Sequence, residues 1–247
     1  MTTLISAEWY KLLRGKVLAV ILAGVTAQTL IQVLGQYIDS EEPLIPGQFG
    51  VTAPADASFL LQVWLIAFVG YFIASEFQNG TMRNILALGK NRTHVYLSKV
   101  FSAFIAIAAI YLAVSIVATA GFSAVSGFGD MTFNEFWRFF AWNFSMEILY
   151  HLPFAAIFTM LAFLSRSLGM TILLGIGYWI VMLFLPGLLS MMGLDFAVEY
   201  LPQYYIGAFK HLSGDPAFIT KGIIVSAAYI VITGIIGCIV FKKSDIR

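Results

Sequence analysis

The chain has 247 residues, of which 60% are hydrophobic and 11% are charged. Ordinary globular domains carry about 25% charged residues, so this composition excludes a water-soluble domain of useful size and predicts a single membrane domain over residues 1–247. The net charge of +1 points to no class of partner, and we expect no nucleic acid to bind. The single cysteine, Cys238, provides neither an intrachain disulfide nor a metal cluster.

Residues 1–16 are predicted to form an amphipathic helix that lies along the membrane interface. Its apolar side chains recur at helical spacing on one face: Ile5, Trp9, Leu12 and Leu13. The alternative is a simple basic anchor for the first span. We expect that span to be retained rather than cleaved, because its apolar run of about twenty residues exceeds that of a signal peptide.

Six apolar runs are long enough to cross a bilayer as helices, which requires roughly 20 residues each. They cover approximately residues 17–38, 57–75, 100–122, 139–164, 168–193 and 219–241. The predicted fold class is therefore all-α: a polytopic membrane protein with six transmembrane helices and the N-terminal interfacial helix.

Basic residues gather in four of the segments that these spans leave outside the bilayer, namely 1–16, 76–99, 165–167 and 242–247. Eleven of the fourteen basic residues lie there: Lys11, Arg14, Lys16, Arg83, Lys90, Arg92, Lys99, Arg166, Lys242, Lys243 and Arg247. Because basic loops remain in the cytoplasm, both termini are predicted to be cytoplasmic.

Residues 194–218 are predicted to be an aromatic outer segment before the last span. Aromatic side chains of this density suit the membrane interface: Phe196, Tyr200, Tyr204, Tyr205 and Phe209. Pro202 and Gly207 interrupt any long helix, so we expect short helices here.

The polar segment 76–99 is predicted to contain a short cytoplasmic helix. Asn79-Gly80 is a turn signal, and Met82, Ile85 and Leu86 follow at helical spacing. Gly89 then ends the helix. A second helix, capped by Asn91 or Thr93, leads into the third span. The exposed face of the short helix and its turn would carry Arg83, Asn84 and Lys90.

Three groups of residues in this segment resemble the first cytoplasmic loop of ABC-2 type transporter permeases. They are Glu76 with Gly80-Thr81, then Gly89-Lys90 with Arg92, then Tyr96 with Ser98-Lys99 at the start of the third span. The basic N-terminal helix, the six spans and the short basic tail are also similar to that family. The small size resembles permeases of peptide-antibiotic export and self-protection, including the lantibiotic-immunity and bacitracin-resistance groups.

The resemblance implies a coupling helix that docks on a separate ATPase. The implied docking residues are Glu76, Gly80, Thr81, Arg83, Asn84 and Lys90. It also implies two ABC ATPase subunits and a second permease copy or homologue in a bacterial plasma membrane. The alternative is that Glu76 pairs with a local base and that Arg83, Lys90 and Arg92 only satisfy the charge rule.

The chain contains no phosphate-binding loop of the form G-x-x-x-x-G-K-[ST]. Gly15-Lys16 and Gly89-Lys90 lack the rest of that motif. We therefore expect no cofactor in this chain and assign ATP and magnesium to the partner ATPase.

Two polar ridges lie within predicted spans. Gln28, Gln32 and Gln36 recur every four residues in the first span, and Asn143, Glu147 and His151 do so in the fourth. Such groups face protein or water, because lipid offers no hydrogen-bond partner. The glutamines favour a seam between helices. Glu147 and His151 are compatible with a structural hydrogen bond or with a substrate path, whereas a metal site has little support.

These features together predict the permease subunit of an ATP-driven exporter of amphipathic peptides, antibiotics or lipid-like substrates. The first, second and fifth spans would line a dimer interface, as the resemblance implies. The candidate path and interface residues are Gln28, Gln32, Gln62, Asn143, Glu147, His151 and Pro186. We expect no enzymatic activity in this chain. The alternative function is an ATP-independent carrier in which Glu147 and His151 relay protons.

Overall fold

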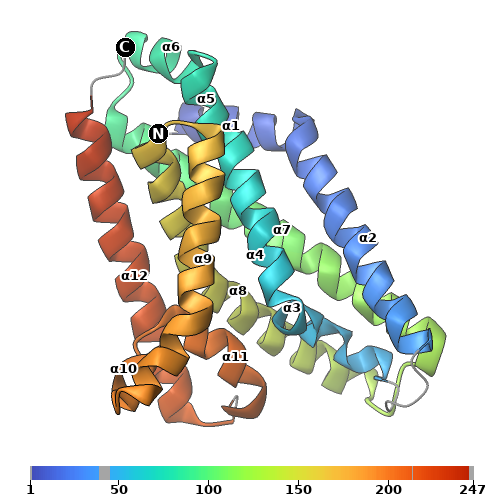
Figure 1. Cartoon of the computed structure of the whole chain (residues 1–247). Coiled ribbons are helices and arrows are strands. Elements are labelled where there is room, and N and C mark those ends of the chain that lie inside the picture. Colours follow the sequence, from blue (N-terminus) through green and yellow to red (C-terminus); the bar gives the residue numbers. More distant parts are fainter. Residues whose placement is uncertain (1, 39–44, 213, 245–247) are drawn as a thin grey trace.

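The computed structural model describes residues 2–38, 45–212 and 214–244 (Figure 1), and within those ranges every regular element is helical. Six helices are long and apolar enough to cross a membrane: Lys16–Ile38 (α2), Ser58–Gln78, Arg92–Ser126 (α7), Phe133–Ser165 (α8), Leu168–Met191 (α9) and Pro216–Lys243 (α12). The prediction of an all-α polytopic membrane protein is confirmed.

The second of these helices is interrupted by a wider turn. It consists of α4 (Ser58–Val69), a π-helical segment η2 (Gly70–Ala74) and α5 (Ser75–Gln78). Single π turns inside α-helices commonly occur at functional sites. Here the turn lies directly before the polar loop, where Gly70 lets α9 approach closely, since an added Cβ would lie 3.1 Å from the Leu168 side chain.

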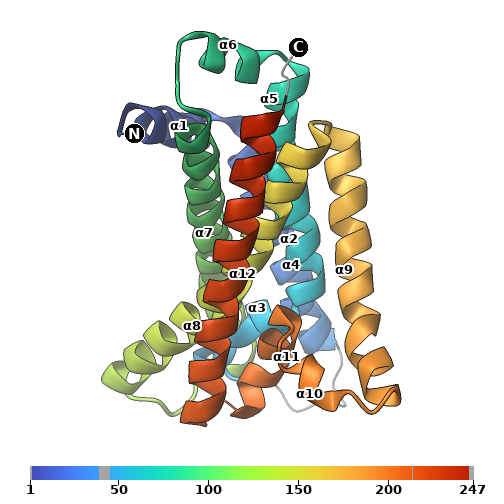
Figure 2. The ribbon, with the colours of Figure 1, turned by 90° about the vertical axis from the view of Figure 1, so that its left-hand side faces the viewer.

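Short helices occupy the two ends of the bundle. Helix α1 (Thr2–Arg14) and α6 (Thr81–Ala87) lie at the end where the described part of α12 also finishes, which we call the terminal end (Figures 1 and 2). The opposite, far end carries η1 (Gly47–Thr52), α3 (Ala53–Asp56), α10 (Asp195–Val198) and α11 (Pro202–Leu212). The aromatic segment 194–218 thus contains two short helices, α10 and α11.

Helices α7 and α8 and the second span are the most buried parts of the bundle. The buried share of the most apolar stretch is 61% for α8, 56% for the second span and 50% for α7, compared with 22% for α2 and α12 and 11% for α9. The core is rich in aromatic rings; Phe154 of α8, for example, packs against Trp179 of α9 with ring centroids 5.5 Å apart. Helix α9 therefore leaves most of its surface available to lipid or to another subunit.

Helix α7 begins about eight residues before the predicted third span. The side chain of Asn91 accepts a hydrogen bond from the backbone N–H of Thr93 at 2.9 Å, which caps the helix. The helix then runs through polar residues into the apolar core. This confirms the predicted second helix that leads into the third span, with Asn91 as its cap. The apolar run alone starts near residue 100, because hydropathy does not register a capped polar turn.

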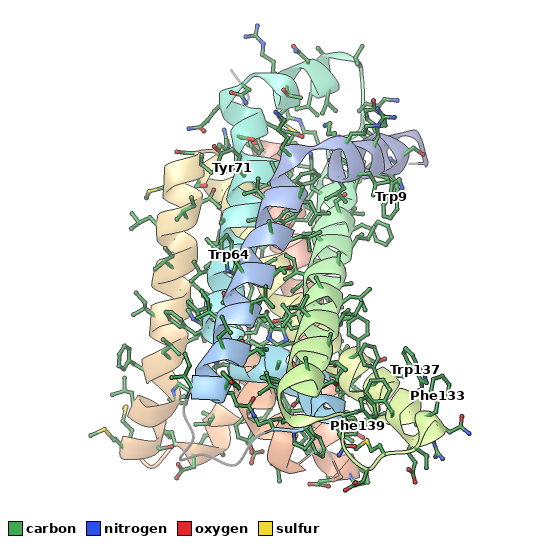
Figure 3. All side chains as sticks on the ribbon, turned by 90° about the vertical axis from the view of Figure 1, so that its right-hand side faces the viewer. Trp9, Trp64, Tyr71, Phe133, Trp137 and Phe139 are labelled. Carbon is green, nitrogen blue, oxygen red and sulfur yellow. The ribbon has the colours of Figure 1, made fainter. Side chains whose placement is uncertain are left out.

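Exposed aromatic side chains mark both ends of the bundle (Figure 3). Trp9 lies on α1 at the terminal end, and Phe133 and Trp137 lie on the first turns of α8 at the far end. Aromatic residues of this kind are enriched at the two water interfaces of a bilayer. Their separation agrees with a bundle that crosses the membrane from end to end.

Gly237 is expected to be intolerant of even one methyl group. An added Cβ would lie 2.1 Å from the hydroxyl oxygen of Tyr96, whose buried ring packs against Phe163. We expect Gly237→Ala to destabilise the protein by about 1–3 kcal/mol, measured as thermal unfolding in detergent. Gly234→Ala is the matched control, because nothing lies within 4 Å of its added Cβ. Equal stability of the two variants would contradict this packing.

Candidate functional site: the terminal end and its buried charges

The short helix predicted in the polar segment is present as α6. Gly80 precedes it with a φ of 72°, a left-handed conformation that glycine adopts without strain. Met82 is fully buried and anchors the helix to the bundle, whereas Arg83, Asn84 and Lys90 are exposed. The segment therefore presents polar side chains outward from an anchored base.

A buried lysine lies beneath this segment. Lys99 of α7 is fully buried, and its Nζ lies 2.6 Å from Glu8 Oε2 of α1 and 2.6 Å from Glu76 Oε1 of α5. The ammonium also sits over the ring of Phe72 at 4.7 Å from the centroid. One buried cation thus joins three helices that are distant in sequence.

Lys11 completes this group, which we call the charge cluster: Glu8, Lys11, Glu76 and Lys99. Its Nζ lies 2.9 Å from Glu76 Oε1 and 3.3 Å from Glu8 Oε1. Burial alone would lower the pKa of Lys11, but the charges of Glu76 and Glu8 outweigh that effect and raise its pKa above the ordinary value. Lys11 therefore remains charged at neutral pH, and its contribution to stability is lost only as the pH rises through that raised value.

The charge cluster links α1, α5 and α7 through buried ion pairs. Removing one partner from a buried ion pair leaves an uncompensated charge and costs about 3–5 kcal/mol. A displacement of α5 relative to α1 or α7 would have to break such contacts. We infer that α1, the α5–α6 segment and the start of α7 move together.

The structure separates the predicted docking residues into two groups. Arg83, Asn84 and Lys90 are exposed, and Gly80 and Thr81 are half-buried. Glu76 is buried and faces Lys99 and Lys11. Its contacts match the alternative interpretation, in which this carboxylate pairs with a local base.

Sequence reasoning did not single out Glu8 or Lys99 as partners. The face of α1 that packs inward carries Leu4, Glu8 and Leu12, whereas Trp9 and Leu13 of the predicted apolar face are exposed. The available signal was that Glu8 is the only acid among the first sixteen residues, on the same helix face as two leucines.

Arg92 ties the start of α7 to the end of α12. Its guanidinium donates to the backbone carbonyl of Phe241 at 3.0 Å, of Lys242 at 3.2 Å, and also of Ser244. The carbonyls of Phe241 and Lys242 belong to the last helical turn and that of Ser244 to the residue that caps it, so all three would otherwise lack intrahelical partners. Arg92 therefore caps a helix in addition to adding positive charge at this end.

The glutamine ridge contributes one contact between helices. Gln28 Oε1 of α2 accepts a hydrogen bond from the indole N–H of Trp64 in α4 at 2.8 Å. Gln32 is half-buried, and Gln62 is almost fully buried. Pro186 lies half-buried inside α9. The structure thus joins Gln28 to the second span, as expected for a seam.

The ridge of α8 lies separately in the core. Asn143 donates to the carbonyl of Phe139 at 2.8 Å. His151 is fully buried, with Nδ1 2.7 Å from the carbonyl oxygen of Glu147 and 3.7 Å from its Oε2. The Tyr111 ring covers the imidazole at a centroid distance of 4.5 Å. These contacts match the structural interpretation, and the substrate path stays a prediction.

Two apolar cavities lie near the terminal end. One, of about 400 Å³, lies between α2 and the second span; the other, of about 440 Å³, lies between α1 and α7 and includes Trp9 and Phe101. In the described ranges, no three His, Cys, Asp or Glu residues are grouped so that they could hold a metal ion.

The chain matches a known protein family. The profile of a family described as ABC-2 family transporter protein covers residues 4–182, from α1 into α9, and so includes α6 and the whole charge cluster. No curated protein matches the chain.

Proposed function

Because the chain belongs to the ABC-2 family of transporter proteins, we propose that it is the membrane subunit of an exporter driven by a separate ABC ATPase. The chain itself is a multi-pass membrane component with no phosphate-binding loop. ATP and magnesium would therefore be held by the partner. The observation that carries the proposal is α6, which is anchored by Met82 and exposes Arg83 and Asn84.

In this proposal the terminal end is cytoplasmic and α6 is the docking element. The basic side chains at that end agree with this orientation. The ATPase would contact Arg83, Asn84 and Lys90 and the half-buried turn at Gly80 and Thr81. Glu76 would act from below, by holding α5 to Lys99.

Through the charge cluster, movement of a docked ATPase would be transmitted to the membrane helices. A push on α6 reaches α5, and from Glu76 it passes through Lys99 to α7 and α1. The wider turn at Gly70–Ala74 lies on the same helix and divides the pushed end from the rest of the span. ATP-driven closure of two ATPases would thereby change the arrangement of the membrane helices to which α6 is joined.

We also propose that two such subunits pair through α2, the second span and α9. The small buried shares of α2 and α9 support their part in this arrangement, since these helices leave broad apolar faces without an intrachain partner. The second span is more buried and α12 is as little buried as α2, so the choice of these three helices rests on the family resemblance. Between the paired faces, an amphipathic peptide, an antibiotic or a lipid-like molecule would move outward. Antibiotic resistance or peptide export in a bacterial plasma membrane is the corresponding role, by analogy with the small permeases of this family.

The second candidate function is a proton-coupled carrier that uses Glu147 and His151. Its support is the closeness of two titratable groups in the core. The hydrogen bond at 2.7 Å, however, joins the imidazole to a backbone carbonyl, which exchanges no protons. Neither side chain lines the two cavities described above.

Glu147→Gln is expected to leave the pH dependence of transport unchanged, because the backbone contact to His151 survives this substitution. The measurement is uptake of a fluorescent amphiphilic peptide into inverted vesicles, with and without ATP, at a series of pH values. His151→Gln is the companion variant, which tests the other member of the pair. Uptake that no longer varies with pH in either variant would favour the carrier.

A further inference from the structure

A groove runs between α2 and the second span in the half of the bundle nearest the terminal end. Its walls are apolar except at one end, and its volume is about 400 Å³. The lining residues are Lys16, Val17, Val20, Ile21, Trp64, Ala67 and Tyr71. Trp64 and Tyr71 lie on the second span beside α2, with Tyr71 nearer the terminal end (Figure 3).

The groove has the length and the chemistry of a hydrocarbon chain site. Trp64 and Tyr71 are seven residues apart, which corresponds to roughly 10 Å along a helix. Val17, Val20 and Ala67 between them offer no hydrogen-bonding side chains. The one indole N–H on the wall, that of Trp64, already donates to Gln28. A peptide backbone in this groove would leave its polar groups unsatisfied, whereas an acyl chain has none.

The side chain of Lys16 provides a positive charge at the terminal end of the groove. Lys16 is exposed, and among the described residues it has no ion-pair partner. The neighbouring cations are engaged elsewhere: Lys11 is held by two carboxylates, and Arg14 lies over the ring of Tyr10. Lys16 is also the first residue of α2, where helix amides and the helix dipole favour an anion.

We propose that this groove binds an anionic phospholipid, with one acyl chain along Trp64 and Ala67 and the phosphate at Lys16. The charge at one end and the apolar walls beyond it match the two parts of such a lipid. The groove lies on the α2 and second-span face at which two subunits are proposed to pair. The proposal nevertheless goes beyond the transport function, because binding requires neither an ATPase nor a transported substrate. The expected binding does not depend on which end of the bundle is cytoplasmic, because the lipid is supplied in both leaflets of the membrane.

The test is tryptophan fluorescence quenching in reconstituted full-length protein. The vesicles are made of phosphatidylcholine with a fixed minor fraction of one lipid that is brominated in mid-chain. That brominated lipid is either phosphatidylglycerol, which is anionic, or phosphatidylcholine, which is zwitterionic. The fluorescence of Trp64 is obtained by subtracting the fluorescence of the Trp64→Phe variant from that of the same protein with Trp64 present. We expect the brominated anionic lipid to quench Trp64 more strongly than the brominated zwitterionic lipid.

Of the basic residues at the terminal end, only Lys16 is expected to determine the preference for the anionic lipid over the zwitterionic lipid. Lys16→Gln should lower the relative affinity for the anionic lipid about fivefold, the effect of one basic residue near an anionic surface. Lys243→Gln is the matched control, since this exposed lysine lies at the end of α12 and outside the groove. It should leave the preference intact.

A second pair of variants tests the acyl-chain part. Ala67→Phe places a ring in the groove and should reduce quenching of Trp64 by both lipids, whereas Ala227→Phe on the exposed face of α12 should not. Equal quenching by the two lipids in the unaltered protein would overturn the proposal, because the groove would then contact bulk lipid only. An absence of quenching would also overturn it and would indicate that another protein surface covers the groove.

Discussion

Replacement of Lys99 by methionine is expected to lower the free energy of unfolding by about 3–5 kcal/mol. This substitution leaves Glu8 and Glu76 buried and facing one another with only the half-exposed Lys11 to compensate them. Methionine fills a similar volume, so the loss measures charge rather than packing. Thermal unfolding of purified protein in detergent, followed by circular dichroism, is the appropriate measurement.

Two variants separate this effect from a general loss of positive charge. Lys90→Met removes an exposed lysine from the loop just before α7 and should change stability by no more than about 0.5 kcal/mol. Adding Glu8→Gln and Glu76→Gln to Lys99→Met should recover much of the loss, because neutral groups replace all three buried charges. A stable Lys99→Met protein would show that the cluster does not hold these helices together.

Reversing the charge of Arg83 is expected to weaken binding of the partner ATPase at least about tenfold. Arg83 is exposed on α6, and disrupting one docked charge contact costs about 2 kcal/mol or more. Gly80→Pro should have a similar or larger effect, because proline fixes φ near −65° where the chain requires 72°. Co-purification with candidate ABC ATPases and substrate-stimulated ATP hydrolysis are the two measurements.

The control for Arg83→Glu is Lys243→Glu, which makes the same change in charge at the same end of the bundle but away from α6. It should bind the ATPase as the unaltered chain does. Arg83→Glu should retain the unaltered thermal stability within about 1 kcal/mol, since it does not touch the charge cluster. Gly80→Pro should lower the stability as well, because it replaces a left-handed residue and removes a backbone donor to Phe77. Normal ATPase capture by both would show that α6 is not the docking element.

The sequence predicted those parts of the fold that depend on local pattern. Apolar runs located all six long helices, because each residue in lipid must be apolar regardless of its neighbours. The Asn79-Gly80 turn and the following apolar spacing located α6 for a similar reason, since a left-handed turn and a helix face are both local properties. The prediction of a membrane transporter permease rested on the same segment and agrees with the family match.

The partners of buried charges could not be predicted in this way. Lys99 lies 91 residues from Glu8 and 23 from Glu76, and no periodicity connects them. Counting Lys99 among the basic residues outside the bilayer placed it at the correct end of the bundle but said nothing about its burial. Likewise, the inward face of α1 contains Glu8, and a search for an apolar face selected Trp9 and Leu13 instead.

The clamp between Arg92 and the end of α12 has a consequence for biosynthesis. Arg92 is synthesised before the residues whose carbonyls accept its hydrogen bonds, which follow 149 to 152 residues later in the chain. While the chain is growing, the start of α7 must therefore enter the membrane with this contact unmade. The surface proposed to dock an ATPase would reach its final geometry only after the last helix has been synthesised, so a truncated chain lacking α12 would assemble with its loop untethered on that side.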